Sequence, residues 1–104
     1  MTVFTKQDAI NIGKKLNIDF NKYSLDDFTY GLNVELEHGK VTPFTNVTND
    51  DLEITAKIAF AHMLETPDYY VRLKQMEEDI PSSSISNPRA ILTVIGLYLA
   101  YLLV

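Results

Sequence analysis

Residues Thr48 to Glu65 run Thr-Asn-Asp-Asp-Leu-Glu-Ile-Thr-Ala-Lys-Ile-Ala-Phe-Ala-His-Met-Leu-Glu, and this stretch decides the fold. Its first four residues are typical of a helix N-terminus, because their side-chain oxygens accept free amide hydrogens there. At about 100° per residue, the apolar side chains that follow fall on two opposite faces. One face holds Leu52, Ala56, Ala59, Phe60 and Met63, and the other holds Ile54, Ile58 and Ala61. We therefore predict a central helix, buried on both sides, that ends at about Glu65.

Three further helices are predicted around this central one. The first of these helices can be capped by Thr5-Lys-Gln-Asp8 and should run to about Leu16. The second can be capped by Ser24-Leu-Asp-Asp27, and Gly39 can end it. Thr66-Pro67 offers an N-cap and a first-position proline for a fourth helix. The inward stripes are Ala9, Ile12, Gly13 and Leu16, then Leu25, Phe28, Leu32 and Leu36, then Tyr69, Leu73, Met76 and Ile80. No segment alternates with a strand period, so the predicted fold is all-α: a small bundle of about four helices with a C-terminal apolar helix.

One long irregular segment separates the second and third predicted helices. Between Gly39 and Thr48 the sequence has no helical period, and Pro43 excludes a helix through its middle. We predict an ordered loop that Val41, Phe44 and Val47 anchor to the core.

The charge pattern divides the chain. All 14 acidic residues lie at or before Asp79, whereas residues 90–104 carry no charge. We predict an acidic helical head over residues 1–80, a Pro/Ser linker over 81–88 and an apolar helix over 89–104. As a helix, the last segment would be about 25 Å long, against a hydrocarbon core of about 30 Å. It can either anchor the chain in a membrane or dock on protein.

Particular side chains of the apolar segment suit these two roles. Arg89 can extend its charge to a membrane surface, and Tyr98 and Tyr101 can lie near the opposite interface. Together with Ile91, these residues form the predicted membrane-binding or partner-binding set.

Composition excludes several functional classes. The net charge is −5, and the only adjacent bases are Lys14 and Lys15, so we expect no nucleic-acid binding. The absence of cysteine excludes disulfides and thiolate metal sites. The residues after Met1 lack the pattern of a cleavable signal peptide.

The most suggestive polar cluster comprises Glu35, His38, His62 and Glu65. Each Glu and His pair is three positions apart, the spacing of ligands in diiron-carboxylate bundles. Those bundles take a carboxylate from every helix, and the first and fourth predicted helices offer no matching inward acid. We therefore predict no metal and no cofactor. Instead we expect a structural clasp around the irregular loop, made by Glu35, His38, Asp51, His62, Tyr70 and Arg72.

Several stretches resemble a small family of uncharacterised proteins found in bacteriophages, large DNA viruses and some bacteria. They are Phe28-x-x-Gly-Leu-Asn-Val-Glu-Leu-Glu-His-Gly39, Thr45-Asn-Val-Thr-Asn-Asp-Asp51, Thr55-Ala-Lys-Ile-Ala-Phe-Ala-His62, Glu65-Thr-Pro-Asp-Tyr-Tyr-Val-Arg-Leu73 and Met76-Glu77. The resemblance covers most of residues 5–78 and implies a viral or mobile-element context, without an established activity. The apolar segment after Pro88 departs from the ending that is usual in the family.

These observations favour a non-enzymatic structural or interaction module. We expect a minor virion component, attached through the apolar helix to an internal membrane or to capsid protein, with the head on the cytosolic side. The alternative is a small metal-dependent or hydrolytic accessory enzyme that uses Glu35, His38, His62 and Glu65.

Overall fold

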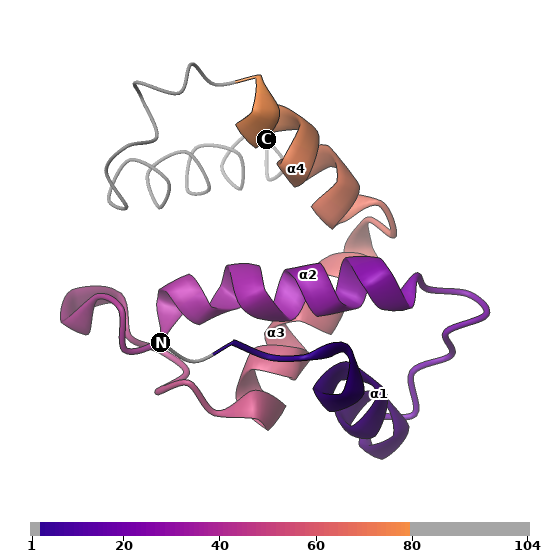
Figure 1. Cartoon of the computed structure of the whole chain (residues 1–104), viewed down its shortest axis with the longest axis horizontal. Helices are drawn as coiled ribbons and strands as arrows, with labels where there is room; N and C mark the ends of the chain where they lie inside the picture. The colour runs from indigo at the N-terminus through magenta and orange to yellow at the C-terminus, as the bar shows by residue number, and fades with distance from the viewer. Residues whose placement is uncertain (1–2, 80–104) are drawn as a thin grey trace. The chain divides into compact units, whose positions relative to one another are not determined.

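The computed structural model describes residues 3–79, and every regular element in that range is helical (Figure 1). The elements are α1 (Lys6–Lys15), α2 (Leu25–Glu35), the 3-10 turns η1 (Leu36–His38) and η2 (Pro43–Thr45), α3 (Leu52–Glu65) and α4 (Tyr69–Glu78). The all-α prediction with four helices is confirmed. The predicted linker over 81–88 and the apolar helix over 89–104 lie outside the described residues, as do Arg89, Ile91, Tyr98 and Tyr101.

Residues up to Tyr70 form one compact unit, and the remainder of α4 belongs to a second unit. In the first unit, α1, α2 and α3 all pack against one another. Its core includes the fully buried side chains of Phe28, Leu32 and Met63. None of the helices within residues 3–79 is long and apolar enough to cross a bilayer.

The predicted caps form at the first two helices. The Thr5 hydroxyl accepts the Asp8 amide at 3.1 Å, while the Asp8 carboxylate accepts the Thr5 amide at 2.8 Å. The Ser24 hydroxyl likewise accepts the Asp27 amide. These local bonds satisfy amides that have no partner within the helix, which is why α1 and α2 begin where the sequence predicts. The second predicted helix differs at its end, because its last turn, η1, tightens into a 3-10 helix before Gly39.

The helix α3 is capped by Asp51 and spans the predicted residues, but it is buried on one side and not on two. Ile54 is 45% exposed and Ala61 is also exposed. The buried residues of α3 are Thr55, Ala56, Ala59 and Met63. Thr55 is tolerated inside because its hydroxyl donates to the Asp51 carbonyl oxygen at 2.6 Å.

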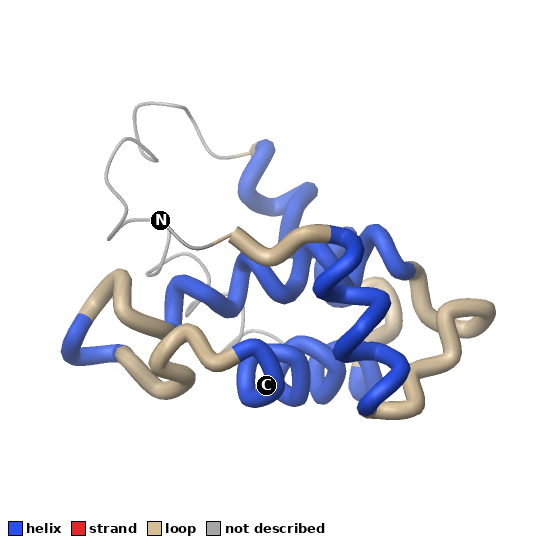
Figure 2. The backbone as a smooth tube through the Cα atoms, turned by 60° about the horizontal axis from the view of Figure 1, so that its bottom comes forward, coloured by secondary structure: helices blue, strands red, loops and turns tan. Residues whose placement is uncertain are grey.

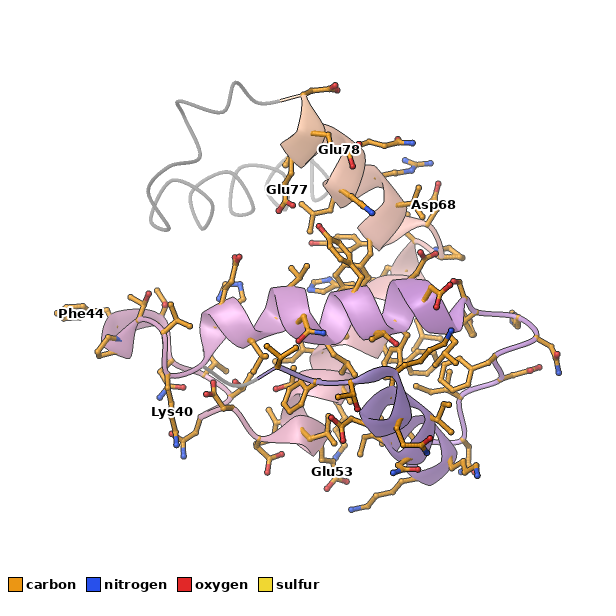
Figure 3. All side chains as sticks on the ribbon, viewed as in Figure 1. Lys40, Phe44, Glu53, Asp68, Glu77 and Glu78 are labelled. Carbon is orange, nitrogen blue, oxygen red and sulfur yellow. The ribbon has the colours of Figure 1, made fainter. Side chains whose placement is uncertain are left out.

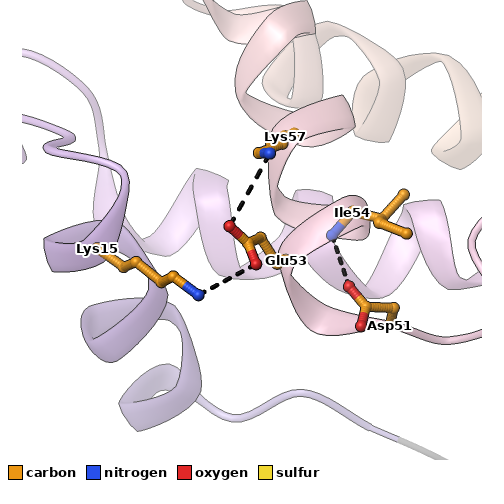
Figure 4. Close-up of polar contacts among 5 residues, drawn as sticks. All are labelled: Lys15, Asp51, Glu53, Ile54 and Lys57. Atoms are coloured by element: carbon orange, nitrogen blue, oxygen red, sulfur yellow. Dashed lines mark hydrogen bonds and ion pairs between the residues drawn. The ribbon is translucent and has the colours of Figure 1, made fainter.

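Charged side chains lie on the exposed surface of α3. Glu53 forms ion pairs with Lys15 of α1 at 3.1 Å and with Lys57 at 3.9 Å, as Figure 4 shows. Because these groups are largely exposed, such pairs stabilise the fold by at most about 1 kcal/mol each.

The fourth helix begins later than predicted. Thr66 ends α3, since its amide donates to the His62 carbonyl oxygen, and it does not cap α4. Pro67 lies in the turn that follows, and α4 begins at Tyr69, whose amide donates to the Thr66 carbonyl oxygen. In the predicted inward stripe, Tyr69 and Leu73 are buried and Met76 is half-buried. The last predicted residue of that stripe, Ile80, lies outside the described range.

The predicted anchors of the loop between α2 and α3 are wrong: Val41, Phe44 and Val47 are all exposed. The loop stands out from the helices in Figure 2, and Pro43 opens the short turn η2 within it. Polar atoms fasten its base instead. The His38 carbonyl oxygen accepts the Val47 amide, and the Asp50 carboxylate accepts the Lys40 amide at 3.0 Å. These bonds hold the loop without any need to bury its apolar side chains.

Candidate functional site

A buried carboxylate lies at the end of α2, where the sequence places its most suggestive polar residues. Glu35 is only 3% exposed. Its Oε1 atom accepts a hydrogen bond from the Tyr70 hydroxyl at 2.9 Å, and Nε2 of His62 lies 3.5 Å from the same oxygen. The three side chains come from α2, α3 and α4, so helices that are distant in the sequence assemble one polar cluster. We call Glu35, His62 and Tyr70 the buried triad.

Close packing holds the tyrosine of this triad in place. The Tyr70 ring lies directly over Gly31, where an added Cβ atom would come within 2.5 Å of the ring. Glycine weakens a helix interior by about 1 kcal/mol relative to alanine. Here its lack of a side chain makes room for a fully buried aromatic ring.

The histidine is held by aromatic contacts. The His62 ring stacks on the Tyr69 ring, with centroids 4.4 Å apart and an interplanar angle of 7°. The Tyr69 ring and the Tyr30 ring each contact the Tyr70 ring edge to face. Two of these rings, those of Tyr70 and His62, lie next to the buried Glu35 carboxylate, and aromatic carbon solvates charge poorly.

This environment shifts the protonation of the whole triad. Burial raises the pKa of Glu35 from its usual 4.5 to about 7, and the hydrogen bond from Tyr70 opposes that rise. Burial is the largest cause that raises the pKa of Tyr70, and the nearby Glu35 charge raises this pKa further. Burial lowers the pKa of His62; the Glu65 charge opposes this effect and His38 adds to it. Near neutral pH, the cluster can therefore bind and release one proton at Glu35, beside a hydroxyl that remains protonated.

The structure divides the predicted clasp. Glu35, His62 and Tyr70 come together, whereas Asp51 caps α3 and Arg72 is an exposed residue of α4. Glu35 bonds Tyr70 and not the loop amides. The loop is held by Asp50, Thr48, Asn46 and the backbone carbonyl of His38.

The four residues of the alternative enzyme hypothesis, Glu35, His38, His62 and Glu65, are only partly assembled. Glu35 and His62 are adjacent, while Glu65 and His38 affect the pKa of His62 electrostatically. Burial also lowers the pKa of His38. Within residues 3–79, no three His, Cys, Asp or Glu side chains lie close enough together to hold an ion.

Sequence reasoning missed two polar residues that organise the fold. The Asn33 amide group accepts from the Phe4 amide and donates to the Phe4 carbonyl oxygen, both at 2.9 Å, and so fastens the segment before α1 onto α2. Asp50 packs against Gly39 so closely that a side chain there would collide with its carboxylate. Asn33 lies outside the predicted apolar stripe of α2, so no signal in the sequence marked it.

Comparison with curated proteins and with solved structures gives no match. One family model matches the chain over residues 9–79, and its description is "Protein of unknown function (DUF5661)". The match spans α1 to α4 except for the first turn of α1, and it therefore includes the buried triad and the exposed loop. Because it covers more than half of the chain, the protein belongs to the DUF5661 family.

Proposed function

We propose that the protein is a non-enzymatic helical interaction module that attaches to a membrane through its apolar segment, residues 89–104. One observation carries the proposal: residues 90–104 contain no charged side chain, while all 14 acids lie at or before Asp79. The family match ends at residue 79, so the apolar segment lies beyond the matched residues. A minor virion component is the setting that the resemblance to viral proteins supports, with the head on the cytosolic side of the membrane.

The burial of Glu35 supports a structural role for the buried triad, as a non-enzymatic module requires. Glu35 has little contact with solvent, and its carboxylate contacts the Tyr70 hydroxyl and the His62 ring within the fold. Such a cluster serves packing and specificity in a small helical domain.

A charge in the apolar segment tests the proposal directly. The full chain should float with phosphatidylcholine and phosphatidylglycerol vesicles in a density gradient. Ile95→Asp should prevent flotation, because an aspartate at the centre of a membrane helix costs about 3 kcal/mol. Ile54→Asp, the same substitution at an exposed position of α3, is the matched control and should still float.

Two results would overturn the proposal. One is a wild-type chain that remains at the bottom of the gradient as a monomer. The other is flotation of Ile95→Asp equal to that of wild type. Failure to float combined with copurification of the chain with viral particles would instead support attachment to capsid protein.

A small hydrolytic enzyme is the second candidate. It is favoured by the buried triad, since carboxylates with a raised pKa beside a histidine are common in active sites. Loss of a hydrolytic activity in Glu35→Gln, with the stability of the fold retained, would support it.

A further inference from the structure

The loop between α2 and α3 exposes three apolar side chains. Phe44 is 99% exposed, the highest value among the large apolar residues of the described range, and Figure 3 shows it pointing away from the helices. Val41 is 56% exposed and Val47 is 70% exposed. Phenylalanine is usually buried, and three exposed apolar residues within one short loop suit binding. We call residues 40–47 the apolar loop.

The apolar loop is already ordered. The Val47 and Thr48 amides donate to the His38 carbonyl oxygen, and the Thr45 amide donates to the Thr42 carbonyl oxygen at 3.1 Å. Pro43 fixes its own backbone angle at the start of η2. Binding through this loop would therefore cost little conformational entropy. An unfastened loop with three exposed apolar residues would be expected to collapse onto the core.

The charge of the apolar loop indicates the kind of surface that it can bind. From Gly39 to Asn49 the sequence has no acid and a single base, Lys40, although the chain carries −5. A phospholipid surface accepts this combination: an aromatic ring lies well at the interface, hydroxyls bond headgroups, and a lysine reaches phosphate. Thr42 supplies a hydroxyl on one side of Phe44, whereas the Thr45 hydroxyl on the other side donates to the Thr42 carbonyl oxygen at 3.4 Å.

We propose that the apolar loop is a second membrane contact, in which Phe44 inserts into the interfacial region of a bilayer. The inference rests on the proposed function, because the apolar segment 89–104 supplies the main attachment to the same bilayer. The loop adds orientation: it fixes which side of the head faces the lipid, which a single attached segment cannot do.

A fluorescent reporter can test insertion, because the chain contains no tryptophan. Phe44→Trp in the full chain should show blue-shifted emission on phosphatidylcholine and phosphatidylglycerol vesicles, and lipids brominated near the headgroup should quench it. Ile54→Trp, at an exposed apolar position of α3, is the control and should show neither effect. If the emission and quenching of vesicle-bound Phe44→Trp match those of vesicle-bound Ile54→Trp, the proposal is overturned.

The same samples separate the two proposals. If Phe44→Trp floats but its tryptophan is not quenched, the proposed loop contact is refuted and the proposed attachment through residues 89–104 still holds. If quenching persists when Phe44→Trp is combined with Ile95→Asp, the loop contact is supported and the proposed role of the apolar segment is refuted. A blue shift that depends on protein concentration and not on lipid would show that the loop binds a second copy of the chain, and would overturn the lipid assignment.

An affinity measurement gives a second readout. Phe44→Ser should weaken vesicle partitioning about ten- to hundredfold, the factor that corresponds to burial of one phenylalanine side chain. Ile54→Ser should partition like wild type. Equal partitioning of Phe44→Ser and wild type would contradict insertion of the ring.

Discussion

Replacing Glu35 with glutamine should stabilise the protein, and the gain should depend on pH. The pKa of Glu35 rises from its usual 4.5 to about 7 in the fold. The two values differ by about 2.5, and each pKa unit corresponds to about 1.4 kcal/mol, so the ionised carboxylate costs the folded state about 3 kcal/mol. Glutamine keeps an oxygen that can accept the Tyr70 hydroxyl and removes the charge.

The sign follows from proton binding. Between pH 4.5 and about 7 the folded chain keeps a proton on Glu35 that the unfolded chain has lost, so the free energy of unfolding falls as the pH rises. The histidines act in the opposite direction. Their pKa values are lowered, so their contribution to stability is lost as the pH falls below 6.5. Glu35→Gln leaves both histidines in place, and Nε2 of His62 lies 3.5 Å from the Glu35 carboxylate, so the difference from wild type reports this carboxylate together with its effect on His62.

Urea denaturation followed by circular dichroism measures this difference across the pH range. Below pH 4.5 the two proteins should be nearly equal, and above pH 7 the variant should be more stable by up to about 3 kcal/mol. Glu78→Gln, at an exposed position of α4, is the control and should show no such rise. A difference between Glu35→Gln and wild type that is the same at every pH would refute the reasoning.

Substitutions at three further positions test packing, backbone bonds and capping by thermal melting at neutral pH. Gly31→Ala should destabilise the fold by about 1 to 3 kcal/mol despite better helix propensity, because the new methyl group collides with the Tyr70 ring; an unchanged melting temperature would show that the ring can move. Asn33→Ala should cost about 1 to 3 kcal/mol by leaving the backbone of buried Phe4 without its two bonds, and retained amide protection of Phe4 in hydrogen exchange would contradict this. Thr5→Ala should cost about 1 kcal/mol through the lost cap, whereas Thr5→Ser, which keeps the hydroxyl, should cost much less.

The helix starts could be predicted because caps are local. The Thr5 and Ser24 hydroxyls and the Asp51 carboxylate each bond an amide three residues ahead, so the signal is contained in four consecutive residues. Thr66 has the same chemistry, yet it ends α3 and does not begin α4. A capping residue between two helices can serve either one, and local sequence does not decide between them.

Burial was harder to predict, because it depends on partners that are distant in the chain. Ile54 and Phe44 are apolar residues that a pattern assigns to a core, yet both are exposed. Glu35 is a charged residue that a pattern assigns to the surface, yet it is buried beside Tyr70, 35 positions away. The spacing of three positions between Glu35 and His38, and between His62 and Glu65, marked a polar cluster in the sequence. The same spacing is found in metal sites and in structural contacts, so it does not distinguish them.

Charged side chains are usually exposed and apolar side chains usually buried, and Glu35 and Phe44 are exceptions of opposite kinds. Their effects on the stability of the fold differ. The buried carboxylate destabilises the fold by about 3 kcal/mol once ionised. The exposed ring costs the fold little, since it lies in solvent in both the folded and the unfolded chain. We therefore expect the two properties to separate. Phe44→Ser should leave the melting temperature unchanged and weaken vesicle partitioning, whereas Glu35→Gln should raise stability above pH 7 and leave partitioning unchanged.

If Phe44→Ser instead lowers the melting temperature as much as a core substitution does, the ring packs on the protein in solution and is not available for lipid. If Glu35→Gln alters partitioning, the buried triad is coupled to the membrane contact. Proton binding at Glu35 would then control attachment as well as stability, because Glu35 ends α2 and only η1 and Gly39 separate it from the apolar loop.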